Sequence, residues 1–258
     1  MTPTLAFDIE TIPDLAGLRT LHGLSASLSD QDVVDMAFQK RRQSHGSDFM
    51  PLHLQRVVAI SCALREGEHF KVWSLGRPED DEATLIQRFF DGIERYLPQL
   101  VSWNGGGFDL PVLHYRALVN GVTAPRYWEL GEDDRDFKWN NYISRYHMRH
   151  LDLMDLLAMY QPRAAVPLDE LARLCGFPGK LGMDGSQVWA TWRDGGLASI
   201  RAYCETDAAN TFLMFLRFQR LRGALTPAAY DAEIARVRAT LGRESGAHWQ
   251  EFLAAWPA

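Results

Sequence analysis

The chain has 258 residues, of which 47% are hydrophobic and 23% charged, so it can bury a sizeable core in one domain with a small appendage. Its formal net charge of −6 excludes a protein that coats duplex DNA through a basic surface, and any nucleic-acid contact should be local and confined to a groove. No apolar run reaches the roughly 18 residues that predict a membrane-spanning helix.

The cysteines and the first residues are typical of a cytoplasmic protein. Cys62, Cys175 and Cys204 are odd in number and lack CxxC spacing, so we expect reduced thiols rather than a disulfide framework or a zinc site. Acids begin at position 8, and no basic segment precedes a long apolar one, so we expect no secretory signal.

The first third of the chain predicts a strand, a polar helix and a hairpin. An apolar run leads into two acids, and Pro13 then stops regular structure. Residues 27–43 are polar and weakly helical, and we expect the basic triplet at positions 40–42 to lie on a solvated helix face. Two β-rich runs flank Glu66 and Gly67, which indicates a hairpin.

The rest of the chain predicts helices with two more strands between them. Apolar residues recur at helical spacing over residues 80–97 and 197–220. A short run at 100–103 meets a glycine cluster and then a helix, and residues 150–160 predict a short strand that leads into a helix. The tail predicts two further helices. This order indicates an α/β fold with a central mixed β-sheet flanked by helices, whose sites gather at strand ends.

The first strand carries two acids on one face. Residues i and i+2 of a strand project to the same side, so Asp8 and Glu10 point together, away from Phe7 and Ile9. Two close carboxylates repel each other unless one takes up a proton or a cation lies between them. Oxygen ligands suit hard cations such as Mg²⁺ or Mn²⁺, so the pair indicates a metal site. The alternative is that Glu10 begins a loop and Asp8 caps nearby backbone.

A glycine cluster precedes a third acid. Asn104 is followed by three glycines, which allow a tight turn and a close approach to a ligand, and then by Phe108 and Asp109. No Gly-Lys-Ser/Thr follows, so a phosphate-binding P-loop is excluded. The alternative for Asp109 is a helix cap, because aspartate is common where a helix begins.

A fourth acid lies on the predicted helix over residues 197–220. Positions i and i+4 share a helix face, so Tyr203 and Asp207 project together. An acid on a mostly apolar face is unusual without a partner. Glu205 falls on a different face, where we expect it to be solvated.

Together, the DxE, NxxxFD and YxxxD segments resemble the motifs of the DEDD superfamily of 3′–5′ exonucleases, in its tyrosine branch. The resemblance covers roughly residues 4–220. Within the superfamily, the chain looks most like a stand-alone group related to the exonuclease domain of family-B DNA polymerases. It implies a ribonuclease-H-like domain over residues 1–220 and a C-terminal helical extension over residues 221–258, packed on the same domain.

The resemblance also implies a reaction and a set of site residues. The implied reaction is hydrolysis of single-stranded DNA from its 3′ end, which releases nucleoside monophosphates and uses two divalent cations, Mg²⁺ or Mn²⁺. The tyrosine would orient the attacking water. The implied metal ligands are Asp8, Glu10, Asp109 and Asp207, which form the catalytic set together with Tyr203. The implied substrate contacts are Ile9, Thr11, Asn104 and Phe108.

Two alternatives stay open for the function. The motifs are shared with enzymes that degrade RNA, so the chain could be a 3′–5′ exoribonuclease, or it could be a non-catalytic nucleic-acid-binding relative. Residues 125–150 alternate aromatic and basic side chains, which suits either single-strand binding or an insertion packed on the sheet edge. We expect structural roles for four further polar residues, which are His147, His150, Asp152 and Asp155.

Overall fold

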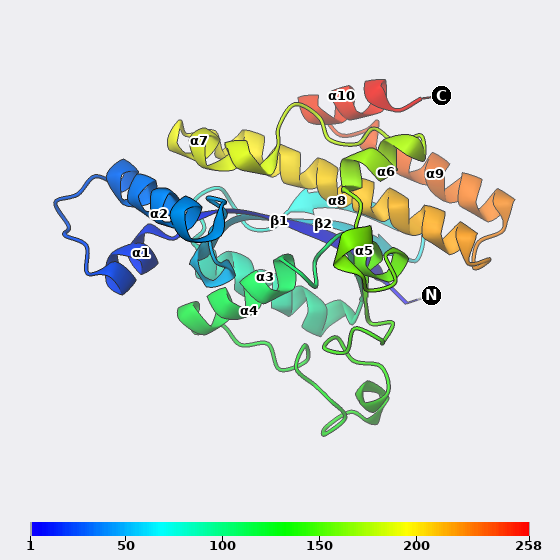
Figure 1. Ribbon diagram of the computed structural model, residues 1–258. Helices are drawn as coiled ribbons and strands as arrows, with labels where there is room; N and C mark the ends of the chain where they lie inside the picture. The colour runs from blue at the N-terminus through cyan, green and yellow to red at the C-terminus, as the bar shows by residue number, and fades with distance from the viewer. Residues whose placement is uncertain (1, 258) are drawn as a thin grey trace.

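A computed structural model describes residues 2–257 and contains one five-stranded mixed sheet, with strand order β3-β2-β1-β4-β5 (Figure 1). The central strand β1 (Thr4–Pro13) is antiparallel to β2 (Gln55–Glu66) and parallel to β4 (Gln99–Ser102). The edge strands are β3 (His69–Ser74), antiparallel to β2, and β5 (His150–Asp152), parallel to β4. The predicted α/β fold with a central mixed sheet is confirmed.

Helices cover both faces of this sheet (Figure 1). The long helix α8 packs against β1 and β2 on one face, with α6, α9 and α10 around it, while α3 and α4 cover the other face. The helices are α1 (Leu15–His22), α2 (Asp30–His45), α3 (Glu82–Tyr96), α4 (Asp109–Asn120), α5 (Leu153–Leu157), α6 (Leu168–Leu174), α7 (Val188–Arg193), α8 (Leu197–Leu221), α9 (Pro227–Leu241) and α10 (Ala247–Ala255).

Alternate residues of β1 face the two helical layers on either side of the sheet, and this alternation decides where its acids point. Phe7 and Ile9 are buried in the core on the side of α3 and α4, whereas Ala6 belongs to the core beneath α8. Since neighbouring strand residues face opposite sides, Asp8 and Glu10 face α8. The register with β2 shifts only after Glu10, so this bulge leaves the two acids on one face.

Most of the predicted elements are present. The hairpin turns at Gly67, whose φ of 53° favours glycine, and the two strongest helical patterns correspond to α3 and α8. Lys40 and Arg42 are exposed on α2, as expected for a solvated face, and all three cysteines are free thiols. Among residues 2–257, no helix is both long enough and apolar enough to cross a membrane.

The two C-terminal helices share a core with the rest of the chain. Tyr230 and Val237 of α9, and Trp249 and Phe252 of α10, lie in the same apolar cluster as Phe212 of α8. The division of the chain at residue 220 into a domain and an extension stays a prediction.

A buried ion network anchors α4, the helix that begins with Asp109. The guanidinium of Arg116 donates to Asp14 at 2.5 Å and to both carboxylate oxygens of Glu82 at 2.8 and 2.6 Å. Glu82 also accepts the backbone N–H of Val57 at the beginning of β2. The network therefore joins the end of β1, the beginning of β2, α3 and α4, and holds α4 in a fixed position against the sheet.

Replacing Arg116 should destabilise the fold strongly. Arg116→Leu leaves the buried carboxylates of Asp14 and Glu82 without their cation, so we expect a loss of about 3–5 kcal/mol in the free energy of unfolding in urea. The matched control is Arg42→Leu, which removes an exposed pair with Asp48 and should change it by about 0–1 kcal/mol. Equal effects of the two substitutions would contradict a stabilising role for the network.

His150 should make the protein sensitive to acid. Its Nε2 lies 2.8 Å from Ser102 Oγ, and burial lowers the pKa of the imidazole from 6.5 to about 4. The unfolded chain therefore binds a proton that the folded chain excludes, and stability falls as the pH drops from 6.5 towards 4. This difference is worth about 3 kcal/mol when complete.

The test compares His150→Gln, which can still hydrogen-bond to Ser102, with the parent protein in urea between pH 7 and pH 4.5. We expect the variant to gain stability relative to the parent as the pH falls. A difference that does not change with pH would refute the assignment. His114, whose pKa burial also lowers to about 4, is retained in both proteins and leaves the comparison unchanged.

Candidate active site

Three acids, two from β1 and one from α8, converge where α8 packs on the sheet. One carboxylate oxygen from each of Asp8, Glu10 and Asp207 lies within 4.8 Å of the other two. Glu10 and Asp207 are 8% and 4% exposed, so this acidic trio is largely removed from water. The sequence places the first two acids on one strand, and the packing of α8 on β1 brings the third to them.

The acidic trio is unfavourable without a cation. Burial and then the charges of neighbouring acids raise the pKa values of Asp8 and Glu10 well above their usual range. Burial also raises the pKa of Asp207, although the charge of Lys180 counteracts it. Like charges at this separation require protons or cations between them.

The oxygen atoms of the acidic trio fit a hard divalent cation. Among residues 2–257, Asp8 Oδ2 and Asp207 Oδ1 are buried and have no hydrogen-bonding partner. Orphaned buried oxygens are costly, and cations such as Mg²⁺ and Mn²⁺ prefer an oxygen donor set. The acidic trio therefore suits the divalent cation that the sequence predicts.

Asp109 lies beside the acidic trio but outside it. It is the first residue of α4, and its Oδ1 accepts the backbone N–H of Ile9 at 3.2 Å, between the two acids of β1. Its charge contributes to the raised pKa of Asp8, and burial raises its own pKa to about 7. The N-cap of α4 is Phe108, which makes no side-chain capping bond, so the helix-cap interpretation of Asp109 is wrong.

Tyr203 lies at the edge of the acidic trio, one turn before Asp207 on α8. It is 5% exposed, and its hydroxyl contacts the ammonium group of Lys180. Burial, followed by the charges of Asp207 and Glu10, raises the pKa of this phenol. The raised pKa keeps the proton on Tyr203 at neutral pH, which suits a hydrogen-bonding role for this phenol.

Lys180 is the one cation that contacts the acidic trio in the described residues, and the sequence motifs do not include it. Its Nζ lies 3.3 Å from Asp207 Oδ2. Burial lowers the pKa of Lys180, but the carboxylates of Asp207 and Asp8 outweigh this effect and raise it. No sequence spacing relates Lys180 to Tyr203, because the two residues lie on different elements. The one sequence signal for Lys180 is its position directly after Gly179.

The backbone of the loop that carries Lys180 is held by two side chains. The Asn210 side chain accepts the Gly179 N–H at 3.2 Å and donates to the Gly179 carbonyl at 2.8 Å. Asp169 accepts the Lys180 N–H at 2.8 Å. Asn210 is fully buried one turn beyond Asp207, so the same helix positions the acid and the loop with its cation.

The four predicted substrate contacts lie in different environments. Asn104 is exposed with φ of 66°, and Phe108 is half-buried and packs on Phe49 with ring centroids 5.7 Å apart. Thr11 is half-buried and donates to Gln55, whereas the Ile9 side chain is 3% exposed in the core opposite the acids. Their contact with a substrate stays a prediction.

Other polar residues near the site have structural partners. His147 accepts the Asn141 N–H at 3.0 Å. Asp152 caps α5 through Asp155 N–H and also accepts the N–H groups of Asn104 and Gly106, so the cap role predicted for it is confirmed. The two bonds from Asn104 and Gly106 to Asp152 hold the glycine loop in place.

The expectation that Glu205 is solvated is wrong. Its Oε1 accepts both the backbone N–H and the hydroxyl of Ser74, and its Oε2 lies 3.0 Å from His248 Nε2. The helical wheel of α8 alone does not show that β3 and α10 close over this face of the helix.

Comparison with known proteins identifies two relationships. Residues 47–256 match a protein family described as a predicted 3′–5′ exonuclease related to the exonuclease domain of PolB. The chain is also 25% identical over 227 residues to a catalytic polypeptide of DNA polymerase epsilon from Aspergillus fumigatus. This match covers 83% of the chain but only 9% of that much longer protein. The matched family region includes Asp109, Lys180 and Asp207 but begins after β1.

Divalent cations should stabilise the protein through the acidic trio. A ligand that binds only the folded state at a hundred times its dissociation constant adds about 2.7 kcal/mol. We therefore expect Mn²⁺ to raise the melting temperature by about 5 °C or more. The increase should vanish in Asp8→Ala and persist in Asp91→Asn, which changes an exposed acid of α3. The same increase in Asp8→Ala would show that the ion binds elsewhere.

Proposed function

Because the chain belongs to the family of predicted 3′–5′ exonucleases related to the exonuclease domain of PolB, we propose that it degrades single-stranded DNA from the 3′ end. The reaction hydrolyses phosphodiester bonds with two divalent cations, Mg²⁺ or Mn²⁺, and releases nucleoside monophosphates. The observation that carries this proposal is the acidic trio, with Tyr203 and Lys180 at its edge.

The acids have distinct roles in this proposal. Asp8, Glu10 and Asp207 would hold one cation, and Asp8 with Asp109, whose charge already acts on it, would hold the second. When bound, the cations would supply a lowered pKa for the attacking water and positive charge for the phosphate and the departing oxygen. Asp109 Oδ1 accepts the Ile9 N–H, which ties β1 to the first residue of α4 and places this carboxylate beside Asp8.

Tyr203 and Lys180 act on the water and the phosphate rather than as bases. The raised pKa of Tyr203 keeps the phenol neutral, so it orients the attacking water through its hydroxyl. Lys180 stays charged beside the same hydroxyl and adds positive charge where the phosphate becomes more negative. Asn210 and Asp169 act through Lys180 by fixing its loop.

The proposal of a single-stranded DNA substrate has two supports. Glu10 and Asp207 are buried and Asp8 is half-buried, so a duplex end would have to fray before its terminal phosphodiester could reach the acids. DNA is preferred to RNA because of the similarity to a DNA polymerase, although the chain spans only a small part of that protein. A cytoplasmic location is proposed from the free cysteines alone.

The test is a degradation assay with Mn²⁺ and oligonucleotides that carry a label at either end. We expect a 5′-labelled single strand to shorten progressively and a 3′ label to leave as a mononucleotide. Asp8→Ala should reduce the rate by at least about 10³-fold because the cation site is lost. Asp91→Asn should retain the parent rate.

Matched DNA and RNA strands separate the alternatives. Faster shortening of RNA would identify an exoribonuclease. Binding of single strands without any shortening, together with no thermal response to Mn²⁺, would identify a non-catalytic relative and overturn the proposal.

A further inference from the structure

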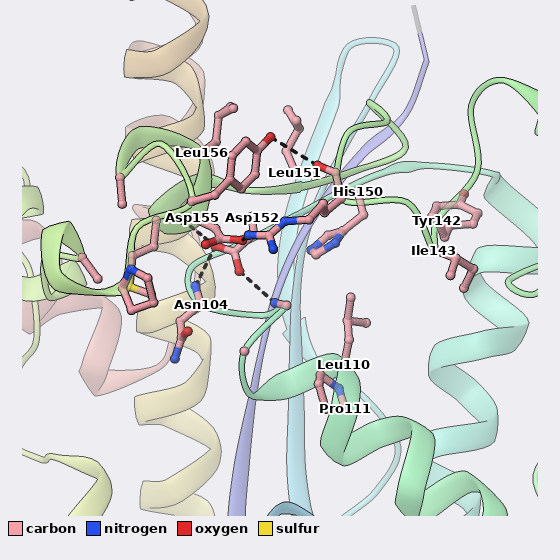
Figure 2. A pocket seen from close by; sticks show the side chains of 18 of the residues that line it. Asn104, Leu110, Pro111, Tyr142, Ile143, His150, Leu151, Asp152, Asp155 and Leu156 are labelled. Carbon is pink, nitrogen blue, oxygen red and sulfur yellow. Dashed lines mark hydrogen bonds and ion pairs between the residues drawn. The ribbon is translucent and has the colours of Figure 1, made fainter.

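A cavity of about 530 Å³ opens beside the candidate active site. One side of it is the glycine loop at Asn104, Gly106 and Gly107, and that loop leads directly to Asp109, which lies beside the acidic trio. Figure 2 shows Asp152 hydrogen-bonded to this loop, between Leu110 and Pro111 on one side and Leu151 and Leu156 on the other. The chemistry proposed above makes no use of this space.

The walls of the cavity are mostly apolar and come from three separate segments. Leu110 and Pro111 belong to α4, Ile143 to the insertion at 125–150, and Leu151 and Leu156 to β5 and α5. The ring of Tyr160 also lines the cavity, and its hydroxyl donates to the Arg145 carbonyl at 3.3 Å. Such walls suit a flat, uncharged group that gains from leaving water.

Strained backbone concentrates around this cavity. Among residues 2–257, the non-glycine residues with positive φ are Leu97, Asn104, Met159 and Tyr160. Asn104 and Tyr160 line the cavity, at 66° and 59°, and Met159, at 52°, precedes Tyr160. Residues other than glycine rarely adopt a positive φ, and those held in this conformation cluster at ligand-binding positions.

The charges of the lining favour a base over a phosphate. Asp152 and Asp155 bring two carboxylates, against the single guanidinium of Arg145, which lies 2.6 Å from Asp155 and 4.5 Å from the Tyr160 ring centre. A phosphate would meet net negative charge, whereas a neutral base would not. His114 also lines the cavity, and its buried Nε2 has no hydrogen-bonding partner within the described residues.

We propose that this cavity binds one unpaired nucleobase of the strand whose 3′ end lies at the acidic trio, with the Tyr160 ring and the Arg145 guanidinium packed over it as its stacking wall. The proposal rests on the proposed function, because the strand must first reach the candidate active site. The volume lies within the range of about 300–1,000 Å³ of pockets that enclose small ligands. A base can enter only when it is unpaired and unstacked, so the cavity selects single strands.

The test measures binding of single-stranded DNA that lacks one base. A series of 5′-fluorescent oligonucleotides carries a single abasic site at successive positions from the 3′ end, and fluorescence anisotropy gives each Kd in Ca²⁺, with the 3′ linkage made non-hydrolysable. We expect one position at which the missing base weakens binding about tenfold, because stacking on an aromatic ring is lost.

Variants of Tyr160 connect that position to the cavity. In Tyr160→Ala the penalty at this position should disappear, while Tyr160→Phe should retain it. The matched control is Tyr96→Ala, since Tyr96 is also half-buried and has the Arg95 guanidinium 5.1 Å from its ring centre, but lies at the end of α3. The proposal is overturned if Tyr160→Ala and Tyr96→Ala retain the same abasic profile.

Two further measurements keep the outcomes separate. If Tyr160→Ala has a lowered melting temperature, Ile143→Trp enlarges a lining side chain from another segment, and it must also abolish the position-specific penalty. Shortening of an intact strand by the parent protein reports the proposed function independently. Shortening with an abasic profile unaffected by these variants rejects the base-binding cavity alone, whereas the absence of shortening rejects the proposed function itself.

Discussion

The close approach of three carboxylates, two buried and one half-buried, is the constraint on which the arrangement around the site depends. Asp8, Glu10 and Asp207 repel one another, and burial increases the cost of their charges. Such a cluster persists only where the surrounding packing prevents it from opening. Here β1 pairs with β2 along its whole length and with β4 over Thr4–Ala6, and α8 lies in a continuous apolar core against it.

Buried charges are also held in place by the surrounding packing in the ion network of Arg116, towards the other end of α4. Arg116 joins that helix to β1, β2 and α3 with geometry that satisfies both oxygens of Glu82. Because Asp109 is the first residue of α4, the position of the helix decides where this acid meets β1. A structural network remote from the acidic trio therefore contributes to the geometry of the candidate active site.

Lys180 supplies a positive charge directly beside the acidic trio. The ammonium group contacts Asp207 and the Tyr203 hydroxyl, so it connects the acids proposed to bind the cations to the residue proposed to orient water. A lysine on a loop would ordinarily be mobile, but Asn210 and Asp169 hold the backbone on the N-terminal side of its Cα. This support comes from α8 and α6, and it makes the loop part of the site.

The sequence by itself determined the strand–helix order and the direction of individual side chains. Periodicity within one element is local physics, so the shared face of Asp8 and Glu10 and that of Tyr203 and Asp207 follow from the spacing alone. The motifs and their spacing also predicted the protein family, and the family match over residues 47–256 agrees with that prediction.

Only the tertiary structure decided what each of those faces meets. The contact of Lys180 with Asp207, the burial of Glu205 against Ser74 and His248, and the cavity beside the glycine loop each join segments that are distant in the chain. The physical reason is that burial and electrostatic partners depend on the packing of α8, α10 and the 125–150 insertion against the sheet. No periodicity along a single segment contains that information.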